Sequence, residues 1–142
     1  MFRSPFLPGV ERSGQYYVRG KRGDRYAIYL RNRSDDRIEA VLSVDGVDAM
    51  NGSPASFAHR GYIIEPGETL EVEGFRDSED SVAAFRFADV KHSYVAEKGG
   101  DVGNVGVVGI AVFGERGNFR YARPPRLRSG ANPFPGEFAT AP

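Results

Sequence analysis

Apolar and polar residues alternate along most of the chain with a period of two, the pattern of strands that bury one face. Between residues 25 and 32, Tyr26, Ile28 and Leu30 fall on the inward side of such a strand. The same alternation predicts further strands, separated by Gly, Pro, Asn or Asp, over residues 15–18, 38–44, 61–65, 69–74 and 82–87. We therefore expect a chain built almost entirely of strands.

The dipeptides Asp45-Gly46, Asn51-Gly52 and Pro66-Gly67 predict tight turns, because glycine readily takes the positive φ that such turns require. Pro66-Gly67 stands between two predicted strands, 61–65 and 69–74, which we expect to pair as a hairpin. Residues 76–80 predict a charged loop, and the one helical turn expected lies at 93–98.

Residues 104–113 form the most apolar segment, which predicts a central strand covered on both faces. Counting this segment, about eight strands follow one another at roughly ten-residue spacing. An α/β fold would need helices between its strands. The sequence thus predicts an all-β fold, an antiparallel β-sandwich or jelly-roll-like domain.

Both ends of the chain concentrate Pro and Gly, which disfavour helices and strands. We predict an N-terminal arm over 1–14, a β-domain over 15–115 and a C-terminal arm over 116–142, with the domain able to fold without residues 120–142. Aromatic and arginine side chains of the arms are predicted to bind a partner, or alternatively to pack on their own domain. They are Phe2, Phe6, Arg12, Phe119, Arg120, Tyr121, Arg123, Arg126, Arg128, Phe134 and Phe138.

The formal net charge is zero, but the charges are unevenly distributed. Residues 1–25 carry six basic and two acidic side chains, residues 26–113 carry eight and fifteen, and residues 114–142 carry five and two. Basic arms around an acidic body favour contacts between subunits, arm against body. The basic residues are spaced rather than massed and the body repels phosphates, so a nucleic-acid partner is not expected.

Catalytic chemistry has few candidates in this sequence. It holds no Cys and only two histidines, and no Gly-x-Ser-x-Gly motif surrounds a serine. His59 has Asp48, Ser53 and Ser56 nearby in sequence, which is proximity without a known geometry. The acidic loop at 77–80 does not match a calcium-binding loop. We expect no enzymatic activity, cofactor or metal.

The longest apolar run, 105–113, is far shorter than the roughly 20 residues that cross a bilayer. The first residues hold no apolar run of the length that a signal peptide needs. We therefore expect no membrane contact and no signal peptide.

The segments 41–47, 61–68, 74–78, 82–87 and 106–113 together resemble a family of uncharacterised bacterial and phage-associated proteins. The resemblance spans about residues 26–115 and misses both arms. It implies a compact β-domain in a bacterial or viral setting, and no activity or functional residue comes with it.

These observations favour a non-enzymatic structural protein that binds neighbouring subunits through its arms and forms homo-oligomers. The most concrete form of this hypothesis is a decoration, cement or vertex protein of a bacteriophage capsid, located in the virion; otherwise the bacterial cytoplasm is expected. The alternative is a soluble bacterial β-sandwich module that binds a glycan or a peptide. The absence of Trp, the favoured sugar-stacking residue, argues against a glycan.

Overall fold

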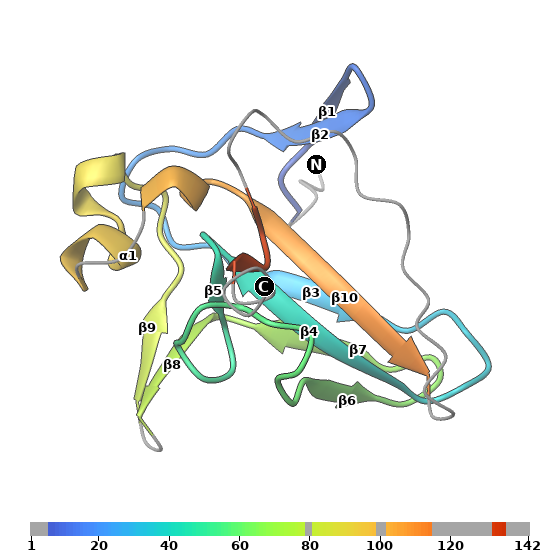
Figure 1. Ribbon diagram of the computed structural model, residues 1–142. Helices are drawn as coiled ribbons and strands as arrows, with labels where there is room; N and C mark the ends of the chain where they lie inside the picture. The colour runs from blue at the N-terminus through green and yellow to red at the C-terminus, as the bar shows by residue number, and fades with distance from the viewer. Residues whose placement is uncertain (1–5, 79–80, 99–101, 115–131, 136–142) are drawn as a thin grey trace.

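The computed structural model describes residues 6–78, 81–98, 102–114 and 132–135 (Figure 1). Every strand pairing among them is antiparallel, and the only helical pieces are three short turns, so the predicted all-β fold is confirmed. The strands are β1 (Gly9–Arg12), β2 (Gln15–Val18), β3 (Ile28–Arg31), β4 (Ile38–Val44), β5 (Val47–Asp48), β6 (Tyr62–Ile64), β7 (Thr69–Val72), β8 (Gly74–Ser78), β9 (Ser81–Ala84) and β10 (Val108–Gly114).

The largest sheet is built around β4, which pairs with β10 on one side and with β5 and β6 on the other. Residues 40–44 are all buried, so β4 is the strand covered on both faces. The expectation that residues 104–113 form the central strand is wrong. β10 is the end strand of the described sheet, and its Val108 and Ile110 are 54% and 42% exposed. The apolar composition of a segment therefore did not distinguish the central strand, β4, from the strand beside it, β10.

A second layer consists of β3 paired with β7 and β8 paired with β9. The principal core lies between this layer and the β4 sheet, and its fully or nearly fully buried members are Leu42, Val44, Ala49, Val72, Phe75 and Phe85. The Phe75 ring meets the Phe85 ring edge-on at 4.9 Å and stacks on the Tyr94 ring at 4.5 Å, measured between centroids. Two layers of strands around one core are consistent with the predicted sandwich.

The predicted hairpin of residues 61–65 and 69–74 does not form, because β6 pairs with β4 whereas β7 pairs with β3. The turn itself is present, and Glu68 N donates to Glu65 O at 3.0 Å. Asn32, which directly follows β3, makes hydrogen bonds to this turn. The Asn32 backbone bonds both Gly67 N and Glu68 O, and its side-chain Nδ2 donates to Ile64 O at 3.0 Å. The turn is therefore shared between the two layers, and its strands enter different sheets.

Two smaller predictions have different outcomes. The charged loop at 76–80 is wrong in its first half, because β8 continues to Ser78 and pairs with β9 through an irregularity between Arg76 and Ser78. The helical turn at 93–98 is confirmed as α1 (Tyr94–Glu97). Ser93 caps it, since its Oγ accepts a hydrogen bond from Ala96 N at 3.2 Å. The 3-10 turns Val90–His92 and Val102–Asn104 flank this region.

Candidate functional site

The N-terminal hairpin of β1 and β2 is the first candidate surface. Its strands pair from Gly9 opposite Val18 to Arg12 opposite Gln15, around a two-residue turn in which Ser13 and Gly14 both have positive φ. This is the turn geometry that fits the twist of a hairpin. The predicted domain boundary at residue 14 falls inside this turn, so residues 9–12 form a hairpin strand with 15–18. The Ser13-Gly14 dipeptide is a turn signal in the sequence. The Pro-rich composition of the residues before it favoured the prediction of an extended arm instead.

Apolar side chains of this hairpin face solvent on both sides. All four residues of β1 are exposed, as are Tyr16, Tyr17 and Val18 of β2, and Tyr16 is 76% exposed. Val10 lies opposite Tyr17 and therefore shares one face with it, whereas Tyr16 lies on the other face opposite Glu11. In Figure 1 the hairpin stands at one end of the molecule, away from β6 and β8.

Two of the predicted partner-binding residues lie in or next to this hairpin. Arg12 is exposed in the last pair before the turn. Phe6 is 60% exposed, and its ring meets the Tyr29 ring edge-on with centroids 5.3 Å apart. Both side chains are at the surface, where a partner could reach them.

Phe134 has a different place. It is 4% exposed and packs on the outer face of the β4 sheet against Val41, Ala55 and Ala111. The expectation that Phe134 binds a partner is therefore wrong, and the alternative of packing on its own domain is confirmed for this residue. The preceding residue fits closely too, since Ser43 Oγ donates to Pro133 O and a Cβ on Gly109 would lie 2.6 Å from the Pro133 side chain.

The other predicted partner-binding residues lie outside the described ranges. They are Phe2, Phe119, Arg120, Tyr121, Arg123, Arg126, Arg128 and Phe138.

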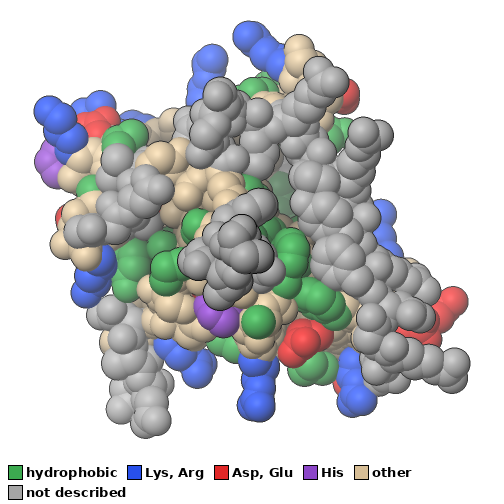
Figure 2. All heavy atoms as spheres, viewed as in Figure 1, with side chains coloured by type: hydrophobic (Ala, Val, Ile, Leu, Met, Phe, Trp, Pro, Cys, Tyr) green, Lys and Arg blue, Asp and Glu red, His purple; other side chains and the backbone are tan. Residues whose placement is uncertain are grey.

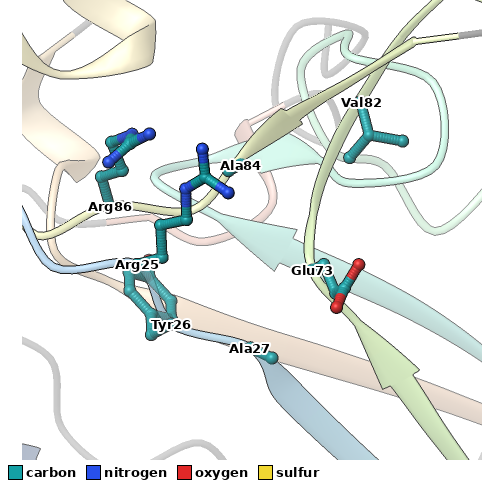
Figure 3. Close-up of a pocket in the computed structure, with 7 residues that line it drawn as sticks. All are labelled: Arg25, Tyr26, Ala27, Glu73, Val82, Ala84 and Arg86. Atoms are coloured by element: carbon teal, nitrogen blue, oxygen red, sulfur yellow. The ribbon is translucent and has the colours of Figure 1, made fainter.

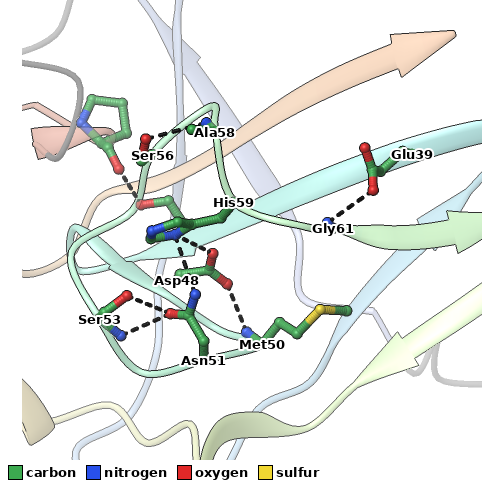
Figure 4. A network of polar contacts seen from close by, with 11 residues as sticks. Glu39, Asp48, Met50, Asn51, Ser53, Ser56, Ala58, His59 and Gly61 are labelled. Atoms are coloured by element: carbon green, nitrogen blue, oxygen red, sulfur yellow. Dashed lines mark hydrogen bonds and ion pairs between the residues drawn. The ribbon is translucent and has the colours of Figure 1, made fainter.

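His59 and Asp48, close in sequence, are in contact in the structure (Figure 4). Asp48 is 1% exposed, and its Oδ2 lies 2.9 Å from His59 Nδ1 while its Oδ1 accepts a hydrogen bond from Met50 N at 2.8 Å. Asn51 Nδ2 also lies 3.2 Å from the same His59 nitrogen. One nitrogen cannot both donate to a carboxylate and accept from an amide. The closer, buried carboxylate fixes the proton on Nδ1.

This pair closes the loop between β5 and β6. The Asp48 backbone donates to Ser53 O at 2.8 Å and accepts from Gly52 N at 2.8 Å, so the same residue organises the start of the loop and holds its end through His59. The two nearby hydroxyls take part in local turns. Ser53 Oγ donates to Asn51 Oδ1 at 2.6 Å, and Ser56 Oγ accepts from Ala58 N at 3.2 Å. The contacts give Asp48 and His59 a structural role.

A groove on the outer face of the second layer is the third candidate. It has a volume of about 530 Å³ and is lined by Arg25, Tyr26, Ala27, Glu73, Val82, Ala84 and Arg86 (Figure 3). Figure 3 shows the two arginines at one end and Glu73 with Val82 at the other. Sequence reasoning missed this set, because its members come from three segments, 25–27, 73 and 82–86, that are up to 61 positions apart and alternate with core residues.

A smaller hollow of about 370 Å³ adjoins this groove and shares Glu73 and Val82 with it. Glu71 lines the smaller hollow and its side chain is hydrogen-bonded to Tyr29. The pKa of Tyr29 is raised, first by its hydrogen bond to Glu71 and then by the charges of Glu71 and Glu73. Glu73 is thus the acidic side chain that both hollows share.

Two other kinds of site concern the described ranges, a metal centre and a membrane span. No three His, Asp or Glu side chains there converge as a metal site would require. No helix in that part of the chain has the length and apolarity needed to span a bilayer. On the face drawn in Figure 2, Lys and Arg side chains project from several separate places around the rim and not from one patch.

The fold and these surfaces define an antiparallel all-β domain with a solvent-exposed N-terminal hairpin and a small charged groove. No protein family model, curated protein or solved structure matches the chain. The resemblance of residues 26–115 to uncharacterised bacterial and phage-associated proteins stays a prediction.

Proposed function

We propose that this chain is a non-enzymatic structural protein that assembles with copies of itself and with neighbouring subunits, using the β1–β2 hairpin as a contact surface. The observation that carries the proposal is the exposure of apolar side chains on both faces of that hairpin. The hairpin is placed as an arm would be, at one end of the domain (Figure 1).

The physical argument concerns what stabilises a hairpin of this kind. A single two-stranded hairpin is at best marginally stable in water, and this one leaves Val10, Tyr16 and Tyr17 in solvent. Each tyrosine can bury roughly 150–250 Å² when a surface closes over it, and tyrosines are enriched in protein interfaces. Contact with a partner would therefore stabilise the hairpin and bury the apolar side chains together.

The charge distribution supports an arm-to-body contact. The hairpin and the residues that follow it belong to a segment with six basic and two acidic side chains, whereas residues 26–113 carry fifteen acidic and eight basic ones. A basic arm of one copy is attracted to the acidic body of the next. A decoration, cement or vertex protein of a bacteriophage capsid is the most concrete setting that we propose, and it rests on the predicted resemblance of residues 26–115.

The test is the oligomeric state of the full chain, measured by sedimentation equilibrium over roughly 1 µM to 1 mM. The wild-type chain is expected to self-associate. The double variant Val10→Ser with Tyr17→Ser removes the apolar residues of one hairpin face and is expected to weaken self-association at least about tenfold, since tenfold corresponds to only about 1.4 kcal/mol.

The matched control is Val90→Ser, which removes an equally exposed valine outside the hairpin and should leave the association unchanged. Circular dichroism verifies that each variant is folded. A wild-type chain that stays monomeric over the whole range contradicts the proposal, as does a hairpin variant that assembles as well as the wild type.

A further inference from the structure

Two arginines lie opposite each other on neighbouring segments, at one end of the groove in the second layer. Arg25 and Arg86 form an antiparallel bridge, bounded by hydrogen bonds from Tyr26 N to Phe85 O and from Phe87 N to Asp24 O, each 3.0 Å. This bond pattern makes them a non-hydrogen-bonded pair, the type in which opposite Cα atoms are only about 4.5 Å apart. Like charges directly opposite each other destabilise a sheet.

Neither arginine has an acidic partner within the described part of the chain. Arg86 Nη1 donates to the neutral Gly23 O at 3.2 Å, and both arginine side chains are exposed. Glu73 lies at the opposite end of the groove (Figure 3). Two exposed positive charges are thus left side by side, an arrangement that an anion placed between them would stabilise.

The rest of the groove is small and is lined by aliphatic side chains together with Tyr26 and Glu73. Ala27 and Ala84 line it between the arginines and Glu73, and Val82 at the far end is 60% exposed. A volume of about 530 Å³ is within the range of small-ligand sites. The groove therefore offers two guanidinium groups for an anion and an aliphatic surface for the stem that carries it.

We propose that this groove binds the carboxylate of an acidic side chain, most suitably a glutamate, on an exposed segment of a partner protein. Arginine forks match the planar geometry of a carboxylate, and the aliphatic lining suits the methylene groups of glutamate. Glu73 and Glu71 lie along the two adjoining hollows and would repel a chain of phosphates, which argues against nucleic acid. This inference does not depend on the hairpin as an assembly surface.

The probe is a terminally blocked pentapeptide with a central Glu between leucines, added to the isotope-labelled full chain and followed by backbone amide NMR. Saturable shifts are expected at residues 25–27 and 82–86, with a Kd on the order of 1 mM. The same peptide with Gln in place of Glu should bind at least about tenfold more weakly, because charge-assisted hydrogen bonds are lost.

Three variants sharpen the test. Arg25→Gln is expected to weaken Glu-peptide binding at least about tenfold and, without peptide, to raise the thermal midpoint by roughly 2 °C through loss of the like-charge pair. Glu73→Gln should strengthen binding severalfold. Arg19→Gln removes an exposed positive charge outside the groove and should change neither quantity.

The inference is overturned when the Glu and Gln peptides shift the same amides equally, or when neither shifts them at roughly 10 mM. Glutarate and inorganic phosphate are titrated in parallel. Equal or tighter binding of either one overturns the assignment to a peptide side chain, because the groove would then take free anions without needing the peptide.

Discussion

The ring of Phe134 packs against the ring of Phe57 with their centroids 4.7 Å apart, so that a residue near the C-terminal end closes over the loop between β5 and β6. Phe113 of β10 meets the same Phe57 ring at 6.4 Å. This aromatic contact covers the face of β4 that is turned away from the principal core. It makes residues 132–135 part of the folded domain, so a deletion of residues 120–142 would remove a buried side chain together with any arm.

Phe134→Ala is expected to destabilise the domain by about 3 kcal/mol, the lower end of the range for truncating a buried phenylalanine. Urea unfolding followed by circular dichroism measures this change. Phe6→Ala truncates an exposed phenylalanine and serves as the control, with a change below about 1 kcal/mol. Equal stability of Phe134→Ala and wild type would show that residues 132–135 do not hold the domain together.

Asn32→Asp is expected to destabilise the fold by about 2–3 kcal/mol, because buried hydrogen bonds are lost and a charge is buried. Asn32 is 2% exposed, and its Nδ2 donates to Asp36 O at 2.8 Å and Ile64 O at 3.0 Å while its Oδ1 accepts from Ser34 N and Ser34 Oγ. The substitution replaces this double donor with an oxygen that faces two carbonyls. Chemical unfolding measures the loss, with the exposed neighbour change Arg33→Gln as its control.

His59→Ala is expected to cost about 2 kcal/mol, the typical loss for a hydrogen bond to a charged group, because it leaves the buried Asp48 carboxylate with one partner fewer. The loop between β5 and β6 should open before the rest of the domain, since Asp48 holds both of its ends. Hydrogen exchange of the amides at residues 50–60 measures this opening. Unchanged protection there would contradict the structural role of the pair. His92→Ala, an exposed histidine, is the control.

Stability is expected to fall as the pH rises above 10, partly because of Tyr26. Burial is the main cause that raises the pKa of Tyr26, with a further contribution from the negative charge of Asp45. Below pH 10 the phenol is neutral in both folded and unfolded chains; above it the unfolded chain ionises first, so stability is lost as pH rises toward the folded pKa. Tyr62, whose pKa burial also raises, acts in the same direction.

Tyr26→Phe should therefore flatten the decline in unfolding free energy between pH 10 and 11, by up to about 1.4 kcal/mol per pH unit. Urea unfolding at a series of pH values measures the slope. Tyr16→Phe changes an exposed hairpin tyrosine and should keep the wild-type decline that Tyr26 causes. An identical slope in wild type and Tyr26→Phe would contradict the burial of this phenol.

Local sequence patterns determined most of the individual strands and turns of this protein, although they missed β1 and the second half of β8. The alternation over 38–44 predicted β4 with its observed bounds, and Asp45-Gly46 predicted the turn at which both residues have positive φ. Ser93 capping a helical turn also follows from its own neighbours. These features depend on side-chain periodicity and on backbone preferences within a few residues, which any sequence displays directly.

Only the tertiary structure decided which strands pair and which surfaces they create. The turn between β6 and β7 is hydrogen-bonded to Asn32, at least 32 positions away along the chain, and Phe134 and Pro133 pack into the space beside Gly109 and Ser43. Arg25 and Arg86 also lie opposite each other because of long-range pairing, since the register of the bridge brings together residues 61 positions apart. Pairing and close packing are set by long-range contacts, which alternation along one segment does not encode.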